Sequence, residues 1–208
     1  MKRRLIPLTS LALAAAATAV SAHAASVRTL SKGSQITIDG QSSVRAFTCK
    51  ARAVRAESDN EPAAALPLPE RIKLLVAGGE LEIAAKALDC GDPAMNQHMY
   101  DALKAQENPQ IRFRIAGVEL GAIAGDSIPV KFKGELTLSG RTLPISLSAT
   151  ATSTNSGGVR LQGSHLLRMT DWGVNPPSLF FGTLKVRDSV VVRFDVAAED
   201  PSSTVAGR

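Results

Sequence analysis

The chain is poor in the residues that nucleic-acid binding and common catalytic motifs require. Six phenylalanines, one tryptophan and one tyrosine are the only aromatic residues among 208, and there are three histidines. Lysines and arginines are interleaved with acids and form no basic stripe with stacking aromatics, which argues against nucleic acid as a partner. Gly-x-Ser-x-Gly and Cys-x-x-Cys motifs are both missing. We therefore assign no catalytic residue, no cofactor and no metal site from the sequence.

A single apolar run has the length and flanks of a targeting segment, and it lies at the N-terminus. The basic residues 2–4 precede the apolar residues 5–20, and Ala22-His23-Ala24 follows with the small-x-small pattern of a cleavage site. The run is shorter than the roughly 20 residues that span a bilayer. We predict that residues 1–24 are a signal peptide, cleaved on export to the periplasm. An uncleaved anchor helix is the alternative. Cleavage lowers the formal net charge from +5 to +2 (5 − 3).

Cysteine is also scarce, since Cys49 and Cys90 are the only two. An even pair in an exported chain favours a disulfide. In the chain-entropy model such a bridge stabilises the fold by about 4 kcal/mol. A redox-active or metal-binding pair is the alternative, but neither a Cys-x-x-Cys nor a Cys-x-His spacing is present. We predict a structural disulfide.

After residue 34 the dominant pattern is alternation of apolar and polar residues, the period of a half-buried β-strand. The clearest segments are 35–39, 111–115, 130–138, 143–149, 159–167 and 190–196. Turn signals such as Ser139-Gly140 separate them. This pattern predicts one all-β domain over residues 25–198, an antiparallel sandwich or barrel with an apolar interior, followed by a flexible tail at 199–208.

Between residues 44 and 108 the pattern is less regular. Residues 44–55, 71–76 and 80–84 have strand character, whereas 57–69 contains three prolines and is predicted to be an exposed loop. Asp92-Pro93 has the form of a helix N-cap followed by proline at the first helical position. The predicted short amphipathic helix ends before Asn108-Pro109, and its apolar stripe consists of Met95, Met99, Ala102 and Leu103.

Several residues bear on what the interior holds. Small residues at inward positions (Gly134, Ala149 and Gly163) would leave space in a barrel for a ligand. His165 shares an inward face, as a core histidine or as a polar group lining a cavity. Three aromatic residues lie within ten positions in a stretch broken by glycine and proline, and such a cluster closes a barrel end or lines a ligand mouth. They are Trp172, Phe180 and Phe181.

These segments resemble, in order, those of the YceI-like family of periplasmic polyisoprenoid-binding proteins. The matching pieces are Ile36–Gly40 with Ser42-Ser43, the stretch from Met95 to Phe113, the hairpin Gly134–Leu147, and the stretch from Thr170-Asp-Trp-Gly173 to Phe194. They cover nearly all of the predicted mature chain. Two features depart from the family pattern. Arg45-Ala46-Phe47 stands where members often carry a His-Asp-Trp-like run, and the loop 57–69 is longer than usual.

The resemblance implies a lipocalin-like antiparallel β-barrel with one helix against it and an apolar lumen for an isoprenoid chain. We predict a binding or carrier protein for a long apolar lipid, and not an enzyme. The predicted ligand-binding residues are Phe47, Phe113, Phe132, Leu136, Leu147, Leu161, Trp172, Phe180 and Phe194.

Two functions from other classes stay open as alternatives. One is a hydrolase or isomerase that acts on an apolar substrate with His165 as general base. The other is a copper-handling protein in which Met95, His98 and Met99 supply soft ligands, although helical spacing alone accounts for the methionines. The oligomeric state is also open, a homodimer included.

Overall fold

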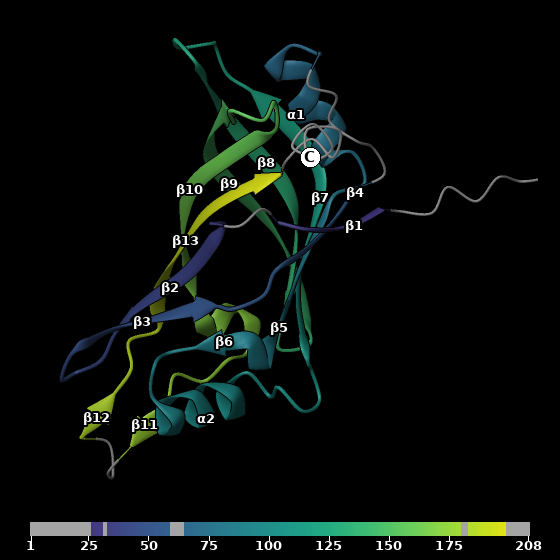
Figure 1. Ribbon diagram of the computed structural model, residues 1–208. Helices are drawn as coiled ribbons and strands as arrows, with labels where there is room; N and C mark the ends of the chain where they lie inside the picture. The colour runs from purple at the N-terminus through teal and green to yellow at the C-terminus, as the bar shows by residue number, and fades with distance from the viewer. Residues whose placement is uncertain (1–25, 31–32, 59–64, 180–182, 199–208) are drawn as a thin grey trace, which may run out of the picture.

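Antiparallel strands that curl into a barrel dominate the fold, with two helices against it (Figure 1). The computed structural model describes residues 26–30, 33–58, 65–179 and 183–198. The predicted signal peptide, 1–24, and the predicted tail, 199–208, lie outside the described residues. The strand-rich, barrel-like fold class is confirmed.

Long strands form most of the wall, and shorter ones close it. The long strands are β7 (Gln110–Leu120), β8 (Ser127–Leu138), β9 (Arg141–Ser153), β10 (Val159–Arg168) and β13 (Ser189–Ala198). The shorter strands of the same sheet are β1 (Ser26–Thr29), β2 (Gln35–Gln41), β3 (Ala46–Ala51), β4 (Arg55–Ser58), β5 (Glu80–Ala84) and β6 (Leu88–Asp89). A separate two-stranded ribbon consists of β11 (Ser178–Leu179) and β12 (Leu184–Lys185).

The barrel closes through strands β3 and β4. They lie near opposite ends of the strand order but belong to one continuous segment of chain. β3 pairs with β2 and β6, while β4 pairs with β1 and β5. Segment 46–58 therefore runs along segment 80–89, and both are interrupted, at residues 52–54 and at the 3-10 turn Ala85–Ala87. At the other side β13 pairs with β2, so the strands enclose one interior.

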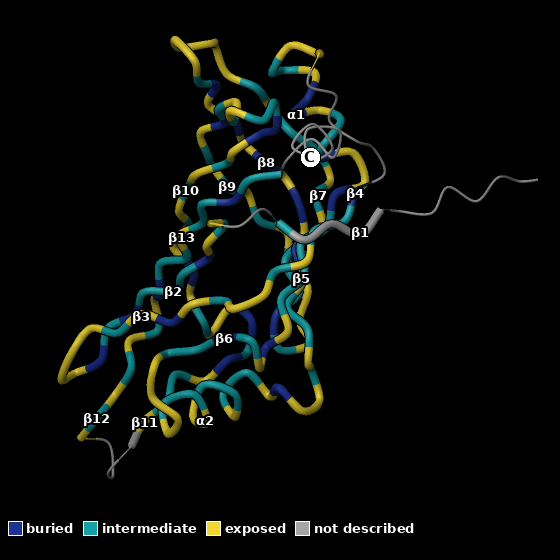
Figure 2. The backbone as a smooth tube through the Cα atoms, in the orientation of Figure 1, coloured by how far each residue is buried: buried dark blue, intermediate teal, exposed yellow. Residues whose placement is uncertain are grey.

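The alternation predicted for the long strands is visible as alternating burial along the chain (Figure 2). The turn between β8 and β9 is Ser139-Gly140, as predicted, and both residues have positive φ, 50° and 78°. A two-residue hairpin turn with positive φ at both positions matches the twist of the strands it joins. This turn fixes the longest register in the sheet, from Leu138–Arg141 to Ser127–Thr152.

The strand prediction for residues 71–76 is wrong, because this segment belongs to helix α1 (Leu68–Val76). Pro67 is the N-cap residue and a second proline lies in the first turn, where a missing N–H costs nothing. Ile72 and Val76 are four residues apart on one face and both are buried. The predicted loop 57–69 is also shorter than expected, since β4 extends to Ser58 and α1 begins at Leu68; residues 59–64 lie outside the described part.

Helix α1 closes one end of the barrel. Its buried residues pack into a core formed by Phe113, Ile128, Val130, Phe132, Ala151 and Val159. On the same helix the guanidinium of Arg71 is buried and donates hydrogen bonds to the carbonyl oxygens of Gly157 and Gly158 and to the Ser153 hydroxyl. These hydrogen bonds hold the helix against the β9–β10 turn. The packing of Ile72 and Val76 fills this end of the interior.

Candidate functional site

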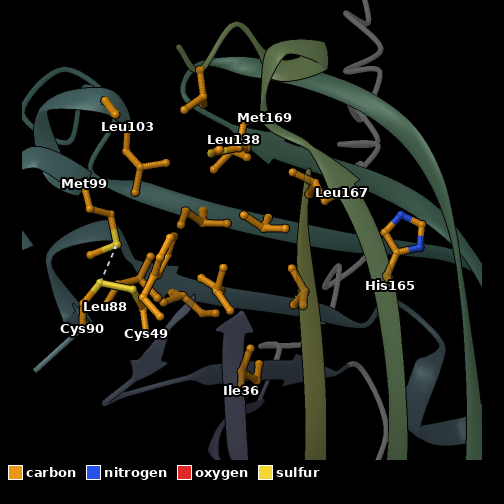
Figure 3. Close-up of a pocket in the computed structure, with 18 of the residues that line it drawn as sticks. Ile36, Cys49, Leu88, Cys90, Met99, Leu103, Leu138, His165, Leu167 and Met169 are labelled. Carbon is orange, nitrogen blue, oxygen red and sulfur yellow. Dashed lines mark hydrogen bonds between the residues drawn. A yellow bond between two sulfur atoms is a disulfide. The ribbon is translucent and has the colours of Figure 1, made fainter. Parts of the chain in front are cut away.

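The interior between the two ends holds an apolar cavity of about 550 Å³. Its walls come from strands on all sides of the barrel and from helix α2 (Pro93–Ala102) (Figure 3). Of 38 lining residues, only five carry polar side chains apart from the two cysteines: Ser42, Arg45, Asp92, His98 and His165. A site of this size and apolarity suits a hydrocarbon ligand, because removal of apolar surface from water drives its binding.

The residues predicted to line the lumen largely do so. Seven of the nine contribute to the cavity wall: Phe47, Phe113, Phe132, Leu136, Leu147, Leu161 and Phe194. They come from six strands, β3, β7, β8, β9, β10 and β13. For the six residues on the long strands, the alternation of inward and outward positions was enough to indicate the inward face, whereas Phe47 lies on β3, where the pattern is less regular. Phe180 lies outside the described residues, and its role stays a prediction.

Trp172 is the exception, because it packs beside the lumen and does not line it. It lies in a 3-10 turn (Met169–Trp172) and is buried in a second core with Leu138, Leu167, Val174 and Val190. Its indole Nε1 donates a 3.0 Å hydrogen bond to the Leu136 carbonyl oxygen. The polar atom of the ring is therefore satisfied by the sheet, and the side chain fixes the turn to β8.

Three of the lumen phenylalanines lie against glycines in the wall. A Cβ atom on Gly163 would lie 2.5 Å from Cζ of Phe194, its cross-strand partner. A Cβ on Gly134 would lie 2.8 Å from the Phe113 ring, and Phe47 covers Gly40 in the same way. Gly134 and Gly163 were predicted to leave empty volume, and this is wrong, because neighbouring rings fill the space above them. The three rings therefore occupy the space next to these glycines, and a cavity lined by the same rings remains in the interior.

The cavity opens between the β2–β3 turn and helix α2. Every exposed residue in its lining belongs to one of these two elements: Val44, Arg45, Asp92, Ala94 and His98. The sequence prediction matched Ser42-Ser43 to the first turn of the family and noted Arg45 as part of a departure from the family pattern, but it placed neither Val44 nor Arg45 among the ligand-binding residues. A four-residue turn has no periodicity from which its position beside a cavity could be inferred.

Helix α2 forms a wall of the cavity, and only its C-terminal end, at Ala102 and Leu103, also packs against the core around Trp172. It begins as predicted, with the Asp92 carboxylate accepting a hydrogen bond from Met95 N. None of its residues is buried. The predicted apolar stripe faces the lumen, since Met95, Met99, Ala102 and Leu103 all line the cavity. The amphipathic pattern therefore indicated a ligand-facing surface, although the same pattern is typical of ordinary core packing.

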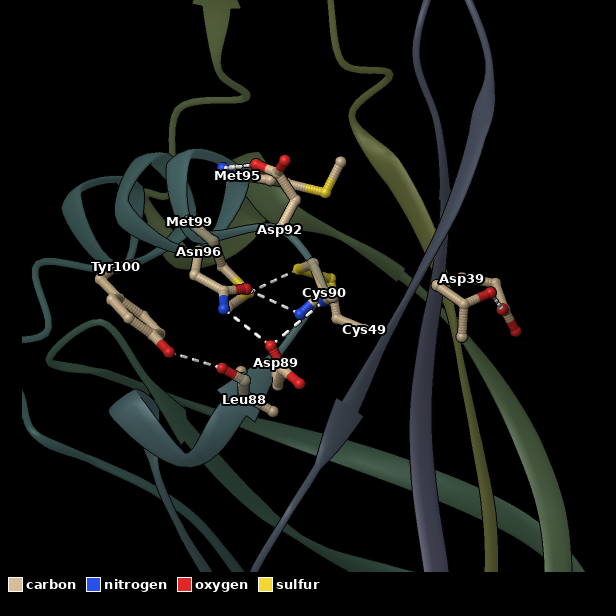
Figure 4. The surroundings of a disulfide bond; sticks show 12 residues. Asp39, Cys49, Leu88, Asp89, Cys90, Asp92, Met95, Asn96, Met99 and Tyr100 are labelled. Atoms are coloured by element: carbon tan, nitrogen blue, oxygen red, sulfur yellow. Dashed lines mark hydrogen bonds between the residues drawn. A yellow bond between two sulfur atoms is a disulfide. The ribbon is translucent and has the colours of Figure 1, made fainter.

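A disulfide and a polar network hold α2 in place (Figure 4). Cys49 of β3 is bonded to Cys90, two residues before the helix cap, which confirms the predicted bridge. Both cysteines line the cavity, and Sγ of Cys90 lies 3.6 Å from Sδ of Met99. On the helix, the Asn96 amide accepts a hydrogen bond from Cys90 N and donates one to Asp89, while the Tyr100 hydroxyl donates to the Leu88 carbonyl oxygen.

Asp89 is the centre of that network. It accepts hydrogen bonds from the Asn96 amide, the Arg52 guanidinium and Gly91 N. These donors stabilise the ionised form and lower the pKa of Asp89 to about 2, with Asn96 as the largest cause. The carboxylate therefore joins β3, β6 and the start of α2 as a charged group at neutral pH.

His165 is the one titratable side chain deep within the described lumen. It lies on β10 opposite Val192 of β13, and burial lowers its pKa below the ordinary value. The other titratable lining residues, Arg45, Asp92 and His98, are at the mouth. His165 is therefore the one side chain of the described lumen, away from the mouth, that could form a hydrogen bond with a ligand.

The described residues contain no group of three or more His, Cys, Asp or Glu side chains that could hold a metal ion. The three residues of the copper alternative, Met95, His98 and Met99, all line the cavity. The two cysteines near them form the disulfide and are therefore not free thiolate ligands. Among the described helices, none is long and apolar enough to cross a bilayer.

Fold and site together define an antiparallel β-barrel protein with an enclosed apolar lumen that opens beside a tethered helix. The YceI-like domain model matches residues 13–198, and the chain belongs to this family. No curated protein matches the chain in sequence.

Solved structures share the fold at low identity. BcnA of Burkholderia cenocepacia is 16% identical with a TM-score of 0.61, over 79% of this chain and 96% of that one. A polyisoprenoid binding domain from Saccharophagus degradans is 14% identical with a TM-score of 0.61, over 86% and 100%. The Campylobacter jejuni YceI protein is 16% identical with a TM-score of 0.51, over 73% and 83%.

Proposed function

We propose that this protein binds a long apolar lipid of the isoprenoid type in the barrel lumen and carries or sequesters it in the periplasm, without chemical turnover. The continuous apolar cavity of about 550 Å³ is the observation that carries the proposal. Membership of the YceI-like family and the likeness to a polyisoprenoid binding domain support it.

The energetics favour a hydrocarbon chain over a compact polar ligand. Each buried CH₂ group contributes about 0.8 kcal/mol, while association costs on the order of 4–15 kcal/mol in lost freedom. A ligand with many CH₂ and CH₃ groups overcomes this cost through surface burial alone. A small polar ligand cannot, because the described wall offers it one deep hydrogen-bonding side chain, His165.

The compartment is inferred from two features. The N-terminal residues 1–24 have the pattern of a cleavable signal peptide, and they lie outside the described structure. The bridge between Cys49 and Cys90 supports an oxidising environment, since disulfides persist there and are rare in the cytosol.

The test is native mass spectrometry of the protein purified from the periplasm, followed by organic extraction. We expect a bound species that extracts as a prenyl lipid at close to one per chain. Leu147→Arg places a cation in the lumen and should abolish retention, whereas Ser148→Arg adds the same charge on the outer face of β9 and should not. A wild-type protein without lipid, or equal retention in the two variants, would contradict the proposal.

A further inference from the structure

One edge of the cavity mouth combines an exposed apolar side chain with exposed cations. Val44, at the tip of the β2–β3 turn, is 71% exposed, the highest value among the exposed large hydrophobic residues of the described chain. Arg45 follows it and is exposed, and both line the cavity opening. An isolated exposed valine needs no explanation, but this one stands beside a cation at the only exposed stretch of the described lumen wall apart from α2.

Strand β12 and the two residues after it supply two further cations to the same edge of the mouth. Leu184 and Val186 line the cavity, while Lys185 and Arg187 alternate with them and are exposed on the outer side. We call Val44, Arg45, Lys185 and Arg187 the basic rim. In the described part of the chain none of its three cations forms an ion pair with a carboxylate.

The basic rim is built rigidly. Ser42 Oγ accepts hydrogen bonds from the backbone nitrogens of Val44 and Arg45 and donates to the Arg45 carbonyl oxygen. Ser43 N donates to the Lys185 carbonyl oxygen at 2.8 Å, and Lys185 N donates to Ser43 Oγ. Arg187 N donates to the Gln41 carbonyl oxygen. These hydrogen bonds connect the β2–β3 turn to β12, and they hold Val44 in a defined position at the edge of the mouth.

The acids near this edge are already engaged. Asp92, on the α2 side of the mouth, caps the helix through Met95 N. Asp188, next to Arg187 in sequence, accepts hydrogen bonds from Thr170 N, the Thr170 hydroxyl and Arg168. The basic rim therefore presents three cations around an exposed apolar tip, and no carboxylate of the described residues forms an ion pair with them.

We infer that the basic rim docks the mouth of the barrel on an anionic lipid bilayer. The negative surface potential of anionic headgroups attracts the three cations, and the valine side chain inserts into the membrane interface. Docking in this orientation aligns the apolar lumen with the acyl region, so that a lipid passes between bilayer and barrel without crossing water. The role of this docking in lipid transfer rests on the proposed function, whereas membrane binding itself is measured independently of lipid retention.

The experiment is flotation of the mature protein with vesicles of pure phosphatidylcholine and with vesicles of equal parts phosphatidylcholine and phosphatidylglycerol. We expect binding only to the anionic vesicles, weakened by salt. Each basic residue near such a surface contributes a factor of roughly five. Lys185→Gln/Arg187→Gln should thus weaken binding by roughly 25-fold, and neither residue lines the cavity.

The matched control is Lys73→Gln/Lys131→Gln, which makes the same charge change at α1 and on the outer barrel wall and should have little effect. Val44→Asp should weaken vesicle binding, whereas Leu166→Ser, an exposed apolar residue on the outer face of β10, should not. Equal losses in the two charge pairs, or no binding to anionic vesicles by the wild type, would overturn the inference. Lipid retention by native mass spectrometry decides the proposed function independently, since a protein can bind vesicles and retain nothing, or the reverse.

Discussion

The ring of Phe194 lies over Gly163, the residue directly opposite it on β10, so closely that a single methyl group on the glycine would collide with the ring. Phe47 covers Gly40, its directly opposed partner, in the same manner, while Phe113 covers Gly134 diagonally, because Phe113 pairs with Leu136. Aromatic rings laid over cross-strand glycines pin the register of a sheet. Here the glycines also leave room beside the wall for three bulky side chains that line the cavity.

Gly40→Ala tests this relationship at the position where the ring is free to give way. The three atoms nearest to a Cβ at Gly40 all belong to the Phe47 side chain, whereas alanine at Gly134 or Gly163 would also strike a backbone oxygen. We expect Gly40→Ala to push the ring into the lumen and reduce lipid retention, measured by extraction and mass spectrometry. Restored retention in Gly40→Ala/Phe47→Leu would establish the cause, and unchanged retention in the single variant would contradict it.

Removal of the disulfide should loosen the α2 side of the lumen. Cys49→Ala/Cys90→Ala releases a 41-residue separation and should cost up to about 4 kcal/mol, a fall in Tm of roughly 8–16 °C for a domain of this size. Calorimetry of the wild type with and without reductant measures the same change. Reductant should have no further effect on the double variant, and a Tm insensitive to both treatments would show that the network around Asp89 holds the helix alone.

Acid stability should depend on Asp89. Its pKa is lowered from 3.8 to about 2 in the folded chain, so the folded state binds a proton less readily than the unfolded state. The stabilisation is complete above about pH 4 and is lost as the pH falls through about 2. Asp89→Asn should lower the Tm at pH 7 and reduce its steep fall between pH 4 and pH 2. Asp101→Asn, on the exposed side of the same helix, serves as control and should leave the wild-type profile.

His165 distinguishes a lipid binder from an enzyme. Burial lowers its pKa, so the folded chain disfavours the charged form and loses stability as the pH falls below about 6.5. His165→Leu should flatten the pH dependence of Tm in that range and retain the lipid, since the new side chain matches the apolar wall. Loss of a measurable turnover of an apolar substrate in this variant would instead favour a hydrolase or isomerase.

Much of the barrel could be inferred from the sequence because the information is local. The period of two in β7 to β10 and β13 needs no partner to be recognised, and the six residues predicted on these strands to face the lumen do line the cavity. The Ser139-Gly140 turn and the Asp92-Pro93 helix start are likewise short-range patterns, set by φ preferences and by one capping hydrogen bond.

The tertiary structure decided what depends on neighbours distant in sequence. Residues 71–76 form a helix because the open barrel end buries Ile72 and Val76 on one face, which outweighs their intrinsic preference for strands. Trp172 leaves the lumen because the carbonyl oxygen of Leu136 accepts its indole N–H. The space above Gly134 and Gly163 is filled because the pairing of β7 with β8 brings the Phe113 ring diagonally over Gly134, and the pairing of β10 with β13 sets Phe194 opposite Gly163. Alternation in the sequence determined which side chains point inward; only the packing of strands against one another determined which of them fill the interior and which leave it open.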